Sequence, residues 1–305
     1  MSLIELLVGV LLGATATSGA LTAFATGNAS YQTSQAQARL NERAQYLQSS
    51  LAADLQLAGY YGLNDAALVS VGEALPGGDR LCGPDHLAHW ASPVELQDGY
   101  TLPCPAQGAG AQPGSDVLTV RRASAQLAER EPGRPQLLTS LTDARARQLL
   151  VVAALPAGVA LTAGRTELRD LLVHSYYVAR RADGSNGGDG TQPALRVKNL
   201  TAIAGRVAIV DTEVMPGVED LQVEAGYRDA ASGLLRFVTP AGLSADAKVV
   251  ALRLTLLLRA ERPDPRHVDR RRYRYAGRDY APADHYHRLL LDQTVMLRNA
   301  APAAS

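Results

Sequence analysis

The first 60 residues contain an uncharged apolar run followed by a periodic apolar pattern. No charged side chain occurs between Leu6 and Ala38, and residues 6–25 are mostly Leu, Val, Ala and Gly. Beyond this run, apolar side chains recur every three or four residues, at Leu40, Ala44, Leu47, Leu51, Leu55 and Ala58. That spacing predicts an amphipathic helix with one apolar stripe. Because no proline interrupts residues 2–58, we expect one continuous helix of about 85 Å, at 1.5 Å per residue, that Gly59 ends.

The two halves of this predicted helix have different surroundings. Twenty helical residues cover about 30 Å, which is enough to cross the hydrocarbon core of a bilayer. We therefore expect residues 1–27 to form a transmembrane half and residues 28–60 an amphipathic half that packs on a domain. A cleaved secretion signal is the alternative for the apolar run. It is disfavoured because no basic segment precedes the run, and Glu5 lies where that segment belongs.

After Gly62 the period changes from that of a helix to that of a strand. Apolar side chains at every second position from Val250 to Leu258 alternate with Arg253, Thr255 and Arg259, which predicts a half-buried strand at 249–259. Further expected strands lie at 117–121, 149–155, 170–180, 206–211, 221–227, 234–238 and 289–297. Loops rich in Gly and Pro separate them, which favours antiparallel pairing. The predicted fold is α+β: a long N-terminal helix whose stripe packs on the apolar face of an antiparallel β-sheet domain at 61–305.

Charge and chemical motifs give no indication of an enzyme. The chain carries 30 basic and 30 acidic residues, so its net charge of zero gives no reason to expect direct binding of nucleic acid. No nucleophile-elbow, phosphate-binding or HExxH motif occurs. One segment is rich in arginine, interrupted by Asp264, Asp269, Asp279 and Asp284: Arg262, Arg266, Arg270, Arg271, Arg272, Arg274 and Arg278. The interruptions favour a solvated, salt-bridged excursion over a phosphate-binding surface.

Candidate metal ligands are sparse. His285 and His287 would share a face on a strand, but two ligands do not make a site. Residues 183–190 are rich in Asp, Asn and Gly like a calcium loop, but lack the spacing and the glutamate of an EF-hand, so a hairpin tip is favoured. We therefore predict no metal site and no cofactor.

The N-terminus resembles a known signal. Residues 2–8, SLIELLV, resemble the class III signal motif of type IV pilins and type II secretion pseudopilins. The resemblance implies that a prepilin peptidase removes a leader before Met1, whose amine is then methylated. It also implies that Glu5 pairs with a neighbouring subunit's terminal amine during assembly.

Later motifs point to one family. LAADLQLAGYYG at 51–62, GSDVLTVR at 114–121, SYYV at 175–178, PGVEDL at 216–221 and VMLRN at 295–299 resemble PilW-like minor pilins. The resemblance implies a minor pilin that primes type IV pilus assembly near the tip, with roles in adhesion, twitching motility or DNA uptake. Its partners would be other minor and major pilins, through the helix, and a tip adhesin. It would reside in the inner membrane with its domain in the periplasm, then in the fibre at the cell surface.

The same context bears on the two cysteines. Cys82 and Cys104 lie 22 positions apart in a loop rich in Gly and Pro. A pilin domain faces the periplasm, where disulfides persist, so a disulfide is expected. Metal binding by this pair with His86 and His89 is the disfavoured alternative.

For the whole chain, the alternatives are a J-type pseudopilin of type II secretion, with the same rod and sheet, and a membrane-anchored enzyme. The AGYYG exit from the helix and the closing LRN favour the pilus.

Overall fold

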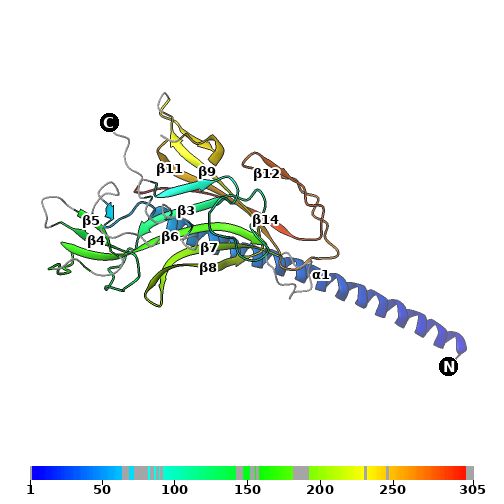
Figure 1. Ribbon diagram of the computed structural model, residues 1–305. Coiled ribbons are helices and arrows are strands. Elements are labelled where there is room, and N and C mark those ends of the chain that lie inside the picture. The colour runs from blue at the N-terminus through cyan, green and yellow to red at the C-terminus, as the bar shows by residue number, and fades with distance from the viewer. Residues whose placement is uncertain are drawn as a thin grey trace.

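The computed structural model shows a helical rod attached to a β-rich body (Figure 1). It describes residues 2–63, 69–71, 82, 86, 89, 92–141, 147–151, 155, 158–180, 192–229, 232–244 and 247–299. The rod is α1 (Leu3–Gln56), whose 54 residues cover about 81 Å. Its N-terminal half stands clear of the body, and its C-terminal half is embedded in it (Figure 1). The single helix predicted for residues 2–58 is confirmed.

The helix ends where the sequence predicts. A turn at 57–59 follows α1, and Gly59 has a φ of +76°, in the left-handed region where glycine carries no steric cost. A Cβ on Gly59 would lie 3.2 Å from the carbonyl oxygen of Asn299. The stop therefore combines a backbone conformation with close packing against Asn299, in the turn that follows the last strand.

Among the described residues, two sheets and a small ribbon make up the body. The larger sheet has eight strands: β1 (Val69–Val71), β2 (Val94–Gln97), β3 (Val117–Ala123), β4 (Gln136–Ser140), β5 (Arg147–Val151), β6 (Thr166–Arg180), β7 (Pro193–Ile203) and β8 (Arg206–Pro216). The second runs in the order β10 (Leu235–Val238), β9 (Val218–Arg228), β11 (Val249–Arg259), β14 (Arg288–Met296). The ribbon is β12 (Tyr273–Tyr275) with β13 (Arg278–Tyr280), and η3 (Pro240–Gly242) is a single 3₁₀ turn.

The α+β class is confirmed, but the sheet differs from the expectation in four ways. Two main sheets replace the single sheet, and β1 pairs with β5 in parallel, in register Val69 with Gln148. The strand expected at 149–155 is wrong in its bounds, because β5 spans Arg147–Val151 and residues 152–154 lie outside the described residues. The sequence analysis predicts no strand at the positions of β1, β2, β4, β7, β12 and β13.

The helical stripe packs against both sheets at once. All six stripe residues are buried, and one apolar cluster joins them to β3, β6 and β7 of the larger sheet and to β9, β11 and β14 of the smaller. Strand β14 lies beside the helix, where the Gln293 amide donates to the carbonyl of Gln48 at 3.1 Å. The stripe of α1 therefore packs into a core that both sheets share, while the opposite side of this half is exposed, as at Glu42 and Tyr46.

The GSD motif lies where the two sheets meet. Asp116 accepts a hydrogen bond from the backbone N–H of Val223 at 2.9 Å, and its own N–H donates to the carbonyl of Leu221 at 2.8 Å. Ser115 receives the Leu221 N–H at 3.0 Å. Burial raises the pKa of Asp116 to about 6. The motif thus links the start of β3 to β9 through hydrogen bonds between the two sheets.

Candidate assembly interface

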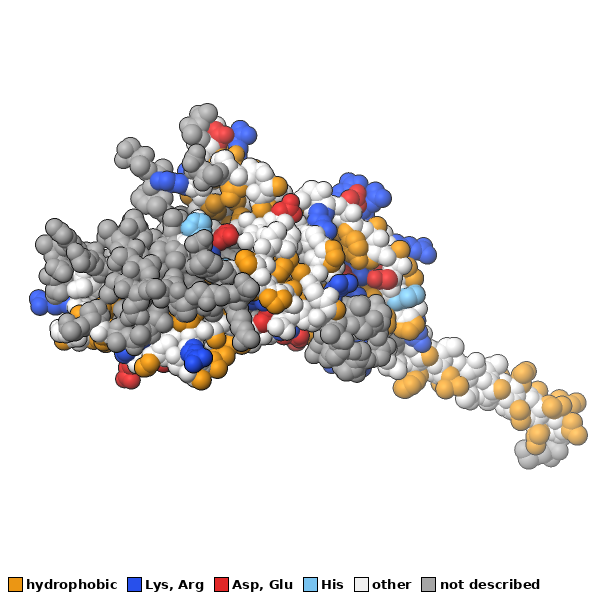
Figure 2. Space-filling view, viewed as in Figure 1, with side chains coloured by type: hydrophobic (Ala, Val, Ile, Leu, Met, Phe, Trp, Pro, Cys, Tyr) orange, Lys and Arg blue, Asp and Glu red, His pale blue; other side chains and the backbone are white. Residues whose placement is uncertain are grey.

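The free half of α1 presents a large apolar surface. An apolar window within Leu6–Gln56 has a mean hydropathy of 1.7 and none of it is buried in the body. By length and composition it can cross a membrane. Figure 2 shows the apolar side chains gathered at the end of the rod. The ones exposed by half or more are Leu3, Ile4, Leu6, Leu7, Val8, Val10, Leu11, Leu12, Leu21 and Phe24. Soluble monomers rarely expose so much apolar surface, so this half needs lipid or other helices around it.

The threonine hydroxyls in this half are satisfied within the helix. Threonine hydroxyls donate to carbonyls three or four residues earlier, at 2.7–3.0 Å: Thr15, Thr17, Thr22 and Thr26. In an apolar medium an unsatisfied hydroxyl is costly, so these bonds fit a helix surrounded by lipid or by packed helices.

The two residues predicted to act in assembly lie wholly or partly outside the described residues. Met1 lies outside the described residues. The backbone of Glu5 belongs to α1, but its side chain lies outside the described part of the chain. Their predicted roles, and the division of the chain at residues 27 and 60, stay predictions.

A buried carboxylate ties the helix to the larger sheet. Asp54 is only 5% exposed, and it receives Arg122 Nε on Oδ1 at 2.6 Å. On Oδ2 it meets His174 Nδ1 at 2.8 Å and the Tyr176 hydroxyl at 2.9 Å. Burial raises the pKa of Asp54, but His174 and Arg122 outweigh it and hold the pKa at about 2. Asp54 is therefore an anion at neutral pH that bonds α1 to β3 and β6.

Sequence reasoning missed this role of Asp54, although a signal was present. Asp54 is one of the polar residues that lie between stripe positions. It lies three residues after Leu51 and four before Ala58, so it has the spacing of the stripe itself. A charged residue at a stripe position indicates a buried ion pair, because an isolated buried charge is too costly.

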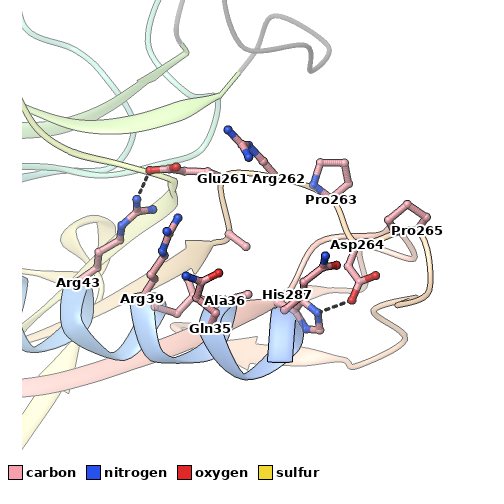
Figure 3. Close-up of a pocket in the computed structure, with 13 residues that line it drawn as sticks. Gln35, Ala36, Arg39, Arg43, Glu261, Arg262, Pro263, Asp264, Pro265 and His287 are labelled. Carbon is pink, nitrogen blue, oxygen red and sulfur yellow. Dashed lines mark hydrogen bonds and ion pairs between the residues drawn. The ribbon is translucent and has the colours of Figure 1, made fainter. Parts of the chain in front are cut away.

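A groove opens where α1 leaves the body (Figure 3). It encloses about 350 Å³ between one face of the helix and the loop after β11. An ion pair of Arg43 with Glu261 borders it, together with a hydrogen bond between His287 Nε2 and Asp264 at 3.2 Å. Arg39 extends from the helix toward the loop. With cations and anions both present, the lining has no single sign of charge.

Much of the arginine-rich segment is paired, as expected. Within the segment, the buried Asp269 receives Arg271 Nε at 3.0 Å. Arg288, which follows the segment and is buried, donates to Glu219 and Asp284 at 2.6–2.9 Å. Further pairs join Arg272 and Arg274 to Asp279, and Arg278 to Asp220. The predicted salt-bridged excursion is confirmed for these residues. Arg262, Arg266 and Arg270 differ, because they are exposed and have no acidic partner among the described residues.

The prediction that His285 and His287 share a strand face is wrong. Both precede β14, which begins at Arg288. His287 is buried and stacks on His267 with ring centroids 3.9 Å apart, whereas His285 is exposed. Burial and the neighbouring His287 lower the pKa of His267. In the described part of the chain no group of three or more His, Cys, Asp or Glu could hold a metal ion. The calcium-like segment 183–190 lies outside the described residues.

The expected disulfide is present. Cys82 and Cys104 are bonded, with their Cα atoms 4.4 Å apart, and both are buried against Val117 and Tyr177. His86, the nearby candidate ligand, is buried and faces the Ser175 hydroxyl at 3.2 Å. Burial lowers the pKa of His86 to about 4, so its ring is neutral at physiological pH. These contacts support the disulfide over metal binding.

Comparisons with known proteins agree with part of this picture. Among solved structures, the chain is similar to a type IV-like pilin from Thermus thermophilus, with 16% identity over 86% of this chain and 98% of that one. The TM-score is 0.36, which is too low to support a fold assignment. The assignment of the fold therefore rests on the helix and strands described above. A comparison with curated proteins finds no match. Residues 175–299, from the SYYV motif to the end of VMLRN and less than half of the chain, match the family model described as Type IV Pilus-assembly protein W.

Proposed function

We propose that this protein is a minor pilin that enters and helps to prime a type IV pilus. The observation that carries the proposal is the free half of α1, an apolar rod with no charged residue from Leu6 to Ala38 that is continuous with a half fixed in the core. The family match at 175–299 supports it, because that family is described by its part in pilus assembly.

The proposed mechanism is physical and needs no catalysis or cofactor. Before assembly the free half of α1 holds the subunit in the inner membrane, with the body in the periplasm. During assembly it leaves lipid and packs among other pilin helices. This exchange replaces one apolar surface by another, so close packing and polar pairing must supply the driving force. Glu5 supplies the polar term by pairing with a neighbour's terminal amine, since a lone carboxylate in lipid is costly.

The rigid joint between rod and body fits this function. The stripe and the bonds of Asp54 fix the body to the helix, so the position of α1 in the fibre sets the position of the body. We infer that the subunit lies at or near the tip, where its body contacts other minor pilins and a tip adhesin. Adhesion and twitching motility are the expected outputs, while any effect on DNA uptake would be indirect.

The second candidate is a J-type pseudopilin of type II secretion, which would use the same rod and body. A deletion strain separates the two: surface pili are recovered by shearing, and secreted proteins are measured in parallel. Loss of pili with normal secretion is the expected result, restored by the wild-type gene. Normal pili with lost secretion would move the protein to the secretion machine. Normal levels of both would contradict an assembly role.

A further inference from the structure

One loop of the body reaches back to the end of the apolar run. Arg266 Nη1 lies 3.4 Å from the carbonyl oxygen of Ala25. The helical residues from Leu3 to Ala25 cover about 34 Å, close to the thickness of a hydrocarbon core. If α1 spans a bilayer over these residues, Ala25 lies where the headgroups begin. The guanidinium of Arg266 then lies at headgroup level.

The loop around Arg266 carries more positive charge than its own acids neutralise. Residues 261–272 contain five arginines and three acidic residues. The three acids are already engaged: Glu261 with Arg43, Asp264 with His287 and Asp269 with Arg271. The exposed arginines without an acidic partner among the described residues are Arg262, Arg266 and Arg270. We call residues 262–270 the basic loop.

The basic loop is preformed. The N–H of Asp264 donates to the carbonyl of His285, and that of Asp269 to the carbonyl of Asp284, at 2.8 and 2.7 Å. Pro263 and Pro265 restrict the backbone between these anchors. The exposed Val268 lies two residues from both Arg266 and Arg270. Figure 2 shows basic and histidine side chains at this end of the body, beside the rod.

We propose that the basic loop binds anionic phospholipid headgroups of the leaflet from which α1 emerges. Arg266 contacts headgroup phosphate, Arg262 and Arg270 add attraction toward the charged surface, and Val268 offers an apolar contact between them. Arginine suits this role because its planar fork binds phosphate oxygens in pairs. This inference rests on the membrane-anchored stage of the proposed function. It adds a second contact with the membrane, through which the body itself is held before assembly.

The test uses the full chain in nanodiscs, where the body has one membrane surface beside it. A fluorophore is attached at His285→Cys, an exposed position hydrogen-bonded to the basic loop. Lipids with a nitroxide on the headgroup quench it when the loop lies on the surface. Discs of phosphatidylcholine alone are compared with discs that also contain phosphatidylglycerol. We expect stronger quenching with phosphatidylglycerol, and loss of the difference at 1 M salt, where the Debye length is about 3 Å.

Variants assign the effect to the loop. R266Q is expected to lower the ratio of docked to undocked body about fivefold, the contribution of one arginine near an anionic surface. R266K should largely retain docking. The triple variant R262Q/R266Q/R270Q should lose the dependence on phosphatidylglycerol. The matched triple variant R206Q/R228Q/R236Q removes the same charge from β8–β10, away from the rod. This variant should retain the dependence on phosphatidylglycerol. Equal circular dichroism spectra would confirm that both triple variants are folded.

Several results would overturn the proposal. Equal quenching in both kinds of disc, or a triple loop variant that still responds to phosphatidylglycerol, would refute a headgroup site on the loop. Displacement by inorganic phosphate would assign the arginines to a free anion, and displacement by duplex DNA to nucleic acid. A chain that enters neither disc would refute the membrane-anchored stage as well. Stable insertion without a lipid response would refute only this inference.

Discussion

Asp54→Asn tests whether a buried charge fixes the rod to the body. The substitution keeps the shape of the side chain but leaves Arg122 beside a neutral amide in a largely buried position. Depression of the Asp54 pKa from 3.8 to about 2 corresponds to about 2 kcal/mol of stability at neutral pH. Removing one partner of a buried pair costs about 3–5 kcal/mol when the other charge is left unpaired. We therefore expect the variant to lose between about 2 and 4 kcal/mol.

The pH dependence separates the charge of Asp54 from its packing. Because the folded-state pKa lies below the unfolded value, the ionised carboxylate stabilises the fold above pH 3.8. This contribution is lost as the pH falls from 3.8 through about 2. The stability difference between wild type and variant should therefore shrink over this window, while a loss due to packing would persist.

The assay is urea unfolding of the full chain in detergent, followed by circular dichroism at several pH values. Asp292→Asn is the matched control, because Asp292 is exposed on β14. It should stay within about 0.5 kcal/mol of wild type, as exposed substitutions usually do. The reasoning would be refuted if Asp54→Asn also stayed within that limit, or if its loss did not change between neutral pH and pH 2.

Three further predictions concern assembly, the disulfide and a tight turn. Glu5→Ala should leave the protein in the membrane but reduce its recovery in sheared fibres, whereas Glu42→Ala on the same helix should not; undiminished recovery would contradict the role of Glu5. Cys104→Ser should destabilise the fold by about 3 kcal/mol through loss of the 22-position loop closure, and unfolding with and without reductant would measure it; no response of the wild type to reductant would contradict it. Gly217→Ala should lower the free energy of unfolding by at least about 1 kcal/mol more than Gly99→Ala in the same assay. Both glycines have positive φ, but only a Cβ at Gly217 would lie 2.5 Å from a carbonyl oxygen. Equal losses for the two alanine variants would show that the turn relaxes.

The sequence predicted what depends on local periodicity. The six stripe positions are all buried, and the clean alternation at 249–259 corresponds to β11. Strand β7 was missed because the buried Lys198 breaks its apolar pattern. The ammonium of Lys198 donates to groups on other segments of the chain, the Asp211 carboxylate at 2.8 Å and the carbonyl of Pro105 at 2.9 Å. Alternation along one strand cannot reveal such partners.

Periodicity also could not fix how the elements meet. It indicated that residues 40–58 bury one side, but not that two sheets share it. The same limit applied to Asp54, because its three partners come from strands more than 60 residues away. The candidate interface was therefore predictable as an apolar rod, whereas the ionic joint behind it required the tertiary structure.

The placement of the stripe has a mechanical consequence. Its buried residues extend along 40–58, about 27 Å of the rod, and β14 lies beside the helix there. A force along the rod, as a fibre under tension would apply, loads these contacts in shear. These contacts and the bonds of Asp54 act at the same time against sliding of the helix along the sheets. They do not open one after another from one end. The subunit is thereby built to bear load along its long axis.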